Sequence, residues 1–496
     1  MKRQTYKLSI ALASLLTLGV VSSCYKDLST GVTHPLEVVD PTSQLQELYE
    51  VEFGSTLTIQ APQYKITNGA NVTPTIEWEV DYKKVSTTST LAYTPTKSSD
   101  YGIHPARLKM QTPDGTYYHR FRIRVNFKYR EGLYALTQQS GKTAVGYYPF
   151  GQSTSPVADI FTEGGVDRDL TGTPQTLNMF THTTGAGRTT NYLFVGADTW
   201  GYRMNADSLK VIGSRMNFNG HTVQANAFSP QDLNEYVVAG GNLYTVGLQT
   251  TLPRRLNDAR LRTAFSGTLP VLAGRMSVWR NAIYSGGLVL FDETTGTAIV
   301  LELSGSGNKV HLFKATYSEP DPFTGQDVSV TGNPFSGSTL LDMSGTATMS
   351  HVALLTYSAS TSEYTLAVIE PNLFLSSSKA GTSYPMQRIA YKGTDRPTHL
   401  ALRPEHNSAY VAAGNKVYLY DLQRQAASSP EAYITLGATE TIQSMVLSGG
   451  TRLYIATYDG SAGAVYSYDV SGSTAQQLWR DTSLGRVTKL VYREPR

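Results

Sequence analysis

Short runs of alternating apolar and polar residues occupy the chain between residues 36 and 128. The clearest four are Ser55–Ile59, Thr75–Val80, Arg107–Gln111 and Tyr118–Phe127. Strict alternation over such lengths is typical of strands that bury one face. Strands of this kind, separated by turn residues over about 90 positions, predict an immunoglobulin-like β-sandwich over 36–128. Trp78 falls on the apolar face of its run, so we expect it in the core.

From residue 129 to residue 496 the chain repeats a unit of three strands joined by a polar turn and a tight turn. The clear copies are His221–Tyr244, Pro397–Tyr420 and Thr441–Tyr468. Including fainter copies, seven anchors stand at Tyr134, Tyr192, Tyr236, Tyr284, Val352, Tyr410 and Tyr454. Their spacing is comparable with the roughly 40–50 residues of a propeller blade. The chain is therefore predicted to be all-β, with a seven-bladed β-propeller over 129–496 and an inserted loop at 318–327.

The two ends of the repeat region complement each other. Val487–Tyr492 has the pattern of the first strand of a unit, yet no unit follows it, and the unit at Leu133 begins without such a strand. We therefore expect the C-terminal strand to complete the first blade and so remove an exposed sheet edge.

The N-terminus has the order of a secretory signal peptide. Three basic residues precede an apolar run, Ile10–Val21, and a small-residue segment that ends at Cys24. The run is shorter than the about 20 residues that span a bilayer. A cysteine at this place resembles a bacterial lipobox, which implies removal of residues 1–23 and lipidation of Cys24. The polar residues 24–35 are then a tether between the lipid and the sandwich.

Composition removes several classes of function. Without Lys2, Arg3 and Lys7 of the signal segment, 39 basic residues balance 39 acidic ones. Such neutrality gives no support for a nucleic-acid partner. Cys24 is the only cysteine, so the lipidated chain keeps no thiol for catalysis or metal binding. The motifs of zinc proteases, phosphate loops and serine hydrolases do not occur, and no metal or cofactor is expected.

Two acidic segments offer candidate chemistry. Glu163, Asp167 and Asp169 cluster in one loop, and two carboxylates about 5–9 Å apart can cleave a glycosidic bond. The alternative is a solvated loop between strands. Asp321 and Asp327 carry oxygen atoms of the kind that Ca²⁺ prefers, although the twelve-residue calcium-loop pattern does not occur.

Aromatic and histidine side chains offer binding chemistry. Trp200, Tyr147 and Tyr148 are the preferred candidates for exposed rings that stack on a sugar or an apolar side chain. Tryptophan also packs between blades, so a core position is the alternative for Trp200. His182 and His221 are candidates to meet across a central channel, against the alternative that both are scattered structural histidines.

The first domain resembles the PKD-like family of Bacteroidetes lipoproteins. The matching features are the hairpin at Gly54, the strand around Trp78, Tyr101-Gly102, the closing Tyr117–Val125, and the exit sequence Tyr129–Leu136. The resemblance covers less than a quarter of the chain. It implies an accessory of an outer-membrane nutrient-uptake system, working beside a SusC/SusD-like transporter complex.

The leading expectation is a surface-exposed lipoprotein that binds an extracellular glycan, glycoprotein or peptide. Two alternatives stay open. One is a propeller hydrolase or lyase that acts on an extracellular polymer, and the other is a non-catalytic scaffold that docks another envelope protein.

Overall fold

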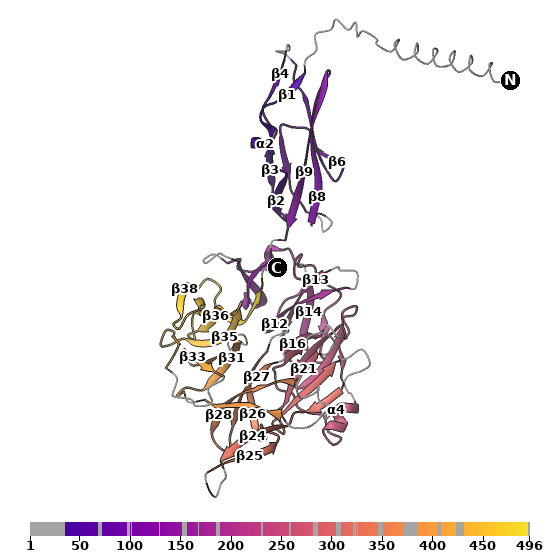
Figure 1. Ribbon diagram of the computed structural model, residues 1–496. Coiled ribbons are helices and arrows are strands. Elements are labelled where there is room, and N and C mark those ends of the chain that lie inside the picture. Colours follow the sequence, from indigo (N-terminus) through magenta and orange to yellow (C-terminus); the bar gives the residue numbers. More distant parts are fainter. Residues whose placement is uncertain are drawn as a thin grey trace, which may run out of the picture. The chain divides into compact units, whose positions relative to one another are not determined.

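The computed structural model divides the chain into two compact units, Met1–Lys128 (unit 1) and Tyr129–Arg496 (unit 2). Figure 1 shows these units, with labels on many of their strands. It describes residues 35–494 except for 68–71, 97–99, 101, 128, 151–155, 167, 185–188, 230–231, 257–258, 281–285, 304–308, 321–323, 325, 346–350, 372–383, 392, 404–407 and 423–430. The signal segment, Cys24 and nearly all of the expected tether therefore lie outside the described residues.

The described residues of unit 1 form three sheets and one short helix, α2 (Pro41–Gln44). A five-stranded sheet has the order β2 (Leu48–Glu52), β9 (Gly115–Asn126), β8 (Gly102–Thr112), β5 (Thr75–Val80) and β6 (Lys83–Ser86). Two-stranded sheets pair β3 (Leu57–Gln60) with β7 (Thr90–Tyr93), and β1 (Leu36–Val38) with β4 (Tyr64–Ile66). The pair β2–β9 is parallel and the other pairs are antiparallel.

One hydrophobic core joins the strands of unit 1. Alternation along β9 buries Phe121, Ile123 and Val125 and turns the intervening arginines outward. The core position predicted for Trp78 is confirmed, because the ring is fully buried and its indole N–H donates to the Thr88 carbonyl at 2.9 Å. The Trp78 ring also packs edge-on against Phe121, with 6.1 Å between ring centroids.

Unit 2 is built from a repeated antiparallel sheet of four strands, which confirms the predicted all-β repeat. The sheets are β12 (Pro174–Thr183), β13 (Thr189–Ala197), β14 (Trp200–Asn205), β15 (Met216–Asn217); β16 (Val223–Ser229), β17 (Asn234–Ala239), β18 (Asn242–Gly247), β19 (Arg254–Arg255); β20 (Ser277–Arg280), β21 (Gly286–Asp292), β22 (Thr297–Leu303), β23 (Lys309–Leu312); β26 (Ser338–Gly345), β27 (Val352–Ser358), β28 (Glu363–Ile369), β30 (Gln387–Ala390); β31 (Pro397–Arg403), β32 (Ser408–Ala413), β33 (Lys416–Asp421), β34 (Ile434–Thr435); and β35 (Thr441–Ser448), β36 (Arg452–Tyr458), β37 (Gly463–Asp469), β38 (Gln476–Asp481). The tight turns between the second and third strands use glycine where the backbone needs a positive φ, as at Gly241 (φ 71°) and Gly414 (φ 58°).

One further sheet combines strands from the two ends of unit 2. It has the order β11 (Lys142–Pro149), β10 (Gly132–Gln139) and β39 (Val487–Arg493), so the last strand of the chain pairs with the first strand of the unit. The Thr137 hydroxyl strengthens this contact by donating to the carbonyls of Leu484 and Arg486 at 3.1 and 2.8 Å.

Additions outside these sheets are small. The helix α3 (Ile160–Glu163) lies between β11 and β12, and α4 (Ala259–Ala264) lies between β19 and β20. The strands β24 (Ala315–Pro320), β25 (Asp327–Gly332) and β29 (Tyr384–Pro385) form a separate three-stranded sheet, which includes the ends of the predicted inserted loop. Among the described residues, no helix combines the length and the apolar character needed to cross a membrane.

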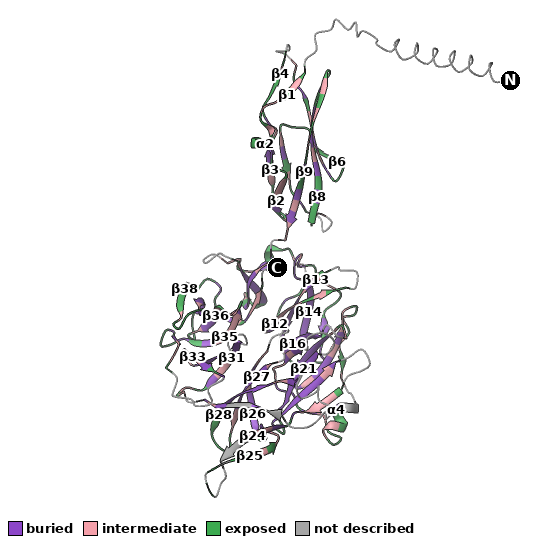
Figure 2. Cartoon of the chain, viewed as in Figure 1, coloured by how far each residue is buried: buried purple, intermediate pink, exposed green. Residues whose placement is uncertain are grey.

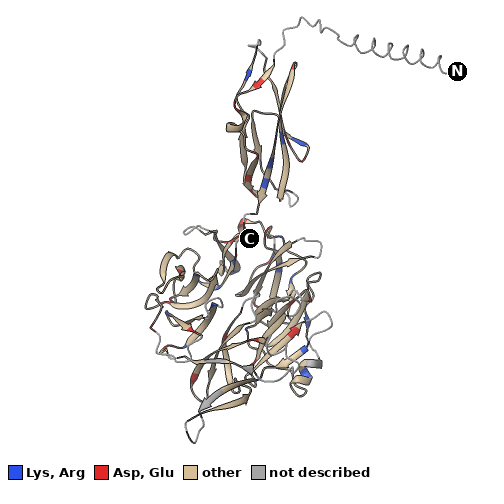
Figure 3. Ribbon diagram, in the orientation of Figure 1, with Lys and Arg blue, Asp and Glu red and all other residues tan. Residues whose placement is uncertain are grey.

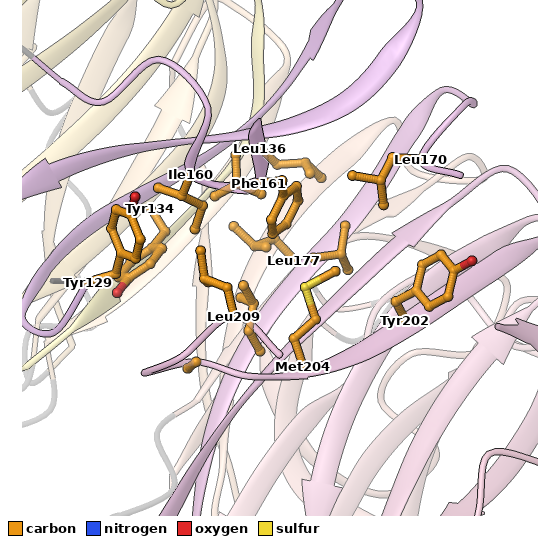
Figure 4. Packing of buried hydrophobic residues seen from close by; sticks show 14 of the residues in the cluster. Tyr129, Tyr134, Leu136, Ile160, Phe161, Leu170, Leu177, Tyr202, Met204 and Leu209 are labelled. Atoms are coloured by element: carbon orange, nitrogen blue, oxygen red, sulfur yellow. The ribbon is translucent and has the colours of Figure 1, made fainter. Parts of the chain in front are cut away.

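Each repeated sheet shares a hydrophobic core with the next, and the last shares one with the first. Because both faces of a sheet are covered, the middle strands are buried almost throughout, as Figure 2 shows. Figure 4 shows one of these interfaces, in which Leu136, Phe161 and Leu177 pack with Met204 and Leu209. The cyclic order of these cores closes the sheets into a ring.

Candidate ligand-binding cavity

A cavity of about 740 Å³ lies where the first strands of the sheets meet. Within the described part of the chain it is lined from seven such strands or their ends, here called the inner strands: β12, β16, β20, β26, β31, β35 and β39. Each inner strand also contacts its neighbours in the ring. The volume falls in the range of about 300–1,000 Å³ that is usual for small-molecule sites.

Four consecutive inner strands bring polar side chains to the cavity at the same register. Each strand carries a β-bulge, and the residue directly after the bulge is Asp342 in β26, His399 in β31, Ser444 in β35 and Lys489 in β39. Bulges re-aim side chains and often occur beside functional sites. All four residues line the cavity, and we call them the polar arc.

Some polar side chains of the inner strands stabilise the fold. The edge of each inner strand that faces the centre of the ring has no strand partner, so its backbone N–H groups need other acceptors. Asp342 accepts from the Leu400 N–H at 2.8 Å, and Ser444 accepts from the Leu490 N–H at 3.0 Å. Ser344 likewise accepts from the Leu402 N–H at 3.1 Å. In each case the side chain reaches from one sheet to the backbone of the next, which supplies the partner that a buried N–H requires.

The polar arc carries one carboxylate and one ammonium group, but the carboxylate is paired with a residue outside the arc. Asp342 forms an ion pair with Arg275 at 3.0 Å, whereas Lys489 has neither a hydrogen bond nor an ion pair among the described residues. Lys489 is open to the cavity but surrounded by protein, and this desolvation lowers the pKa of its ammonium group. Asp342 acts on the Lys489 pKa in the opposite direction and Arg275 in the same direction.

His399 is held by its surroundings in the arc. Its Nδ1 lies 2.9 Å from the Thr398 hydroxyl, and its side chain also hydrogen-bonds to the backbone of Gln443. Burial lowers the pKa of His399; among the nearby charges, Asp342 raises that pKa while Arg275 and Lys489 lower it. The neutral imidazole is therefore favoured at neutral pH.

The other three inner strands add aromatic rings to the cavity lining, here called the aromatic wall: Phe180 from β12, Phe228 from β16 and Trp279 from β20, of which Trp279 is only 1% exposed. The same strands also contribute the polar side chains of Asn178, Asn226 and Ser277. Phe180 stacks on Phe228 with 4.2 Å between ring centroids, and on Tyr192 with 5.0 Å. In the ring order the three strands of the wall complete the circle begun by the four strands of the polar arc. The cavity lining therefore combines polar groups with aromatic rings.

The rings expected to be exposed are buried. Tyr147, Tyr148 and Trp200 expose only 3%, 2% and 3% of their surface, so the prediction of exposed rings is wrong. Tyr147 and Trp200 belong to the hydrophobic core that also contains Leu136 and Leu177, and Tyr148 belongs to the core closed by β39. The reason is that a sheet within the ring packs on both faces, so aromatic residues on either face enter a core.

The expected acidic and histidine sites do not assemble in the described residues. Glu163 accepts from the Tyr129 hydroxyl at 3.1 Å, whereas Asp169 pairs with Arg215 at the surface. His182 lies near the end of β12 and packs against Phe228, while His221 precedes β16 beside Gly240. Asp167, Asp321 and the side chain of Asp327 lie outside the described residues. No cluster of three or more His, Cys, Asp or Glu that suits a metal ion occurs in the part described.

The sequence does contain a signal for the polar arc. Four inner strands share a four-residue pattern, in the order apolar, any residue, polar, apolar. The segments are Leu340–Met343, Pro397–Leu400, Ile442–Met445 and Val487–Leu490. Sequence reasoning treated these segments only as strands and missed the cavity residues, because the bulge interrupts the simple alternation. Along the ribbon of unit 2, Lys, Arg, Asp and Glu are scattered, as Figure 3 shows, so charge density gives no alternative signal.

Comparisons with known proteins give no family for this chain. No family model and no curated protein matches the chain. A solved quinonprotein alcohol dehydrogenase-like protein from Bacteroides thetaiotaomicron has a TM-score of 0.47 at 14% identity, covering 93% of this chain and all of that one. Hsv2p of Kluyveromyces lactis has a TM-score of 0.40 at 10% identity, covering 70% and 97%. The WD40 domain of SCAP from fission yeast has 0.33 at 10% identity, covering 60% and 63%. On the repeated four-stranded sheets and the closed order of their cores, unit 2 is a β-propeller.

Proposed function

We propose that unit 2 is a seven-bladed propeller closed by β39, and that its central cavity binds an extracellular carbohydrate without chemical change. The observation that carries this proposal is the mixed lining of the cavity, which combines the polar arc with the aromatic wall. Sugars present hydroxyl groups and apolar ring faces together. A mixed site of polar groups and aromatic rings is therefore suited to them.

The same geometry disfavours an extended peptide. Peptides that add to a sheet need free backbone groups at a strand edge. At the cavity, the N–H groups of Leu400, Leu402 and Leu490 are already bonded to side chains of the neighbouring sheet. A carbohydrate needs no such edge.

The cavity also gives little support to the hydrolase alternative. Paired-carboxylate glycosidases hold two carboxyl groups about 5–9.5 Å apart. The acidic residues described at the cavity lining are Asp342 and Glu494. Asp342 shares the register of Lys489, five residues before Glu494, which corresponds to roughly 16 Å of strand. Glu494 is also engaged by the Gly449 N–H at 2.9 Å.

We further propose that the protein is tethered to the outer membrane through Cys24 and presents unit 2 outside the cell, beside a SusC/SusD-like transporter complex. The lipobox-like N-terminus and the PKD-like features of unit 1 support this setting. Unit 1, as an immunoglobulin-like sandwich, would then act as a spacer.

A glycan and peptide array with the mature protein tests the binding proposal. Phe180→Ala removes an aromatic side chain from the wall and should abolish glycan binding. Tyr82→Ala removes a ring that is 86% exposed in unit 1 and should leave binding intact. Binding that is lost with Tyr82→Ala but kept with Phe180→Ala would assign the site to unit 1. Retention of an envelope protein without any glycan would favour the scaffold, and release of product from a labelled glycan would favour the enzyme.

Lipid labelling and protease treatment test the setting. The wild-type chain should incorporate labelled fatty acid and Cys24→Ala should not. Protease added to intact cells should remove unit 2, and its survival would contradict surface exposure.

A further inference from the structure

We propose that the carbohydrate bound in the cavity carries a carboxylate and that Lys489 is the residue that binds this group. This inference rests on the proposed function and adds the chemical class of the ligand. It begins from a contrast among the charged side chains of the cavity.

Three of the four charged residues described at the lining are already engaged. Asp342 bonds to Arg275 and to the Leu400 N–H. Arg493 pairs with Asp207 and donates to the Tyr129 carbonyl, and Glu494 accepts from the Gly449 N–H. The fourth is Lys489, whose side chain has no such partner among the described residues. Of the four, its ammonium group is therefore the one that is available to a ligand.

The local charge balance favours an anion beside Lys489. Arg275 and Lys489 are two cations against the single carboxylate of Asp342, and Arg275 holds that carboxylate at 3.0 Å. The neutral His399 adds no further charge at this level. A carboxylate would therefore restore neutrality, and its charge-assisted bond to an ammonium is stronger than a bond between neutral groups.

The available donors suit a carboxylate better than a phosphate. Sites for phosphate commonly combine arginine forks with free backbone N–H groups. Here the N–H groups of Leu400 and Leu490 are occupied by Asp342 and Ser444, and Arg275 is paired. One ammonium group remains.

The position of the aromatic wall indicates how such a ligand would lie. Phe228 and Phe180 stand three and four residues beyond the register of the polar arc on their own strands. At about 3.3 Å per residue this is roughly 10–13 Å along the strands. The ligand therefore needs an acidic group at one end and an apolar surface further along, as in an oligosaccharide of acidic sugars.

The test compares the mature protein with three lysine variants by isothermal titration calorimetry. The probes are α-1,4-tetragalacturonate and its carboxyl-reduced neutral counterpart. The wild type should bind the acidic probe more tightly, and Lys489→Met should weaken that binding about 10- to 100-fold while leaving the neutral probe unchanged. Lys489→Arg should keep most of the affinity because the charge remains. Lys210→Met removes an exposed lysine of unit 2 and should change neither probe. Circular dichroism checks that every variant is folded.

The outcomes separate the two proposals. Equal affinity for both probes, unchanged by Lys489→Met, would overturn the carboxylate inference and leave carbohydrate binding standing. Binding of carboxylate-bearing peptides from the array with no glycan bound would overturn both, as would the absence of any carbohydrate ligand. Loss of neutral-probe binding in a folded Lys489→Met would also overturn the inference, because the lysine would then serve a general role.

Discussion

Breaking the ion pair between Arg203 and Glu235 should lower the stability of the protein strongly, because both side chains are fully buried between two sheets of unit 2. Arg203 donates to Glu235 twice, from Nε at 2.9 Å and from Nη2 at 2.6 Å. Each hydrogen bond to a charged group is worth about 1.5–3 kcal/mol. Glu235→Leu removes both bonds and leaves a buried, uncompensated guanidinium. The expected loss is about 3–5 kcal/mol of the free energy of unfolding, a large part of the roughly 5–15 kcal/mol that stabilises most proteins.

Urea unfolding followed by circular dichroism measures this loss. The double variant Arg203→Met/Glu235→Leu should be more stable than Glu235→Leu alone, because no unpaired charge remains. The control Glu50→Leu breaks the ion pair with Arg124, in which the Arg124 side chain is 42% exposed and the Glu50 side chain 52% exposed. It should cost less than about 1 kcal/mol of the free energy of unfolding. A loss below about 1 kcal/mol for Glu235→Leu, or a double variant less stable than the single one, would refute the reasoning.

Three further predictions follow from the fold and the cavity. Leu490→Ala truncates a 2% exposed residue of the closing strand β39 and should cost about 2–5 kcal/mol of the free energy of unfolding. The control Leu478→Ala, on the exposed edge strand β38, should cost less than about 0.5 kcal/mol. Equal melting temperatures of the two variants would contradict the role of β39. Gly287→Ala would place its Cβ 1.8 Å from the Leu301 carbonyl oxygen and should destabilise the fold by about 1–3 kcal/mol or more. In the control Gly115→Ala, the new Cβ meets nothing within 4 Å, so the change should be tolerated. Equal denaturation midpoints of the two variants would show that β21 can shift. Binding of tetragalacturonate should weaken as the pH rises through the pKa of Lys489, because the ammonium group then loses its charge. Desolvation and Arg275 lower this pKa, and Asp342 raises it. His399 also faces Lys489 and stays neutral over that pH range. Lys489→Arg should instead bind evenly over this range, and identical profiles between about pH 7 and 10 would count against Lys489.

The repeat of strands was predictable because a period of two, a turn and a second strand are local properties of the sequence. The cavity was not, because it depends on bulges that move the polar side chain by one position. Ile442 and Ser444 illustrate this: the register of β35 shifts between them, and only the second lines the cavity. The error at Trp200 has a related cause. Its strand resembles one with a single buried face, but the ring of sheets buries both.

The hydrogen bonds from Asp342, Ser344 and Ser444 to the next sheet have an evolutionary consequence. A substitution at any of these positions would change the pocket and also free a backbone group of its neighbour, so selection for a new ligand would act against stability there. His399 is likewise bonded to the backbone of Gln443 in β35, whereas the Lys489 side chain bears no such bond among the described residues. Ligand preference can therefore drift at Lys489 while the closed ring is conserved.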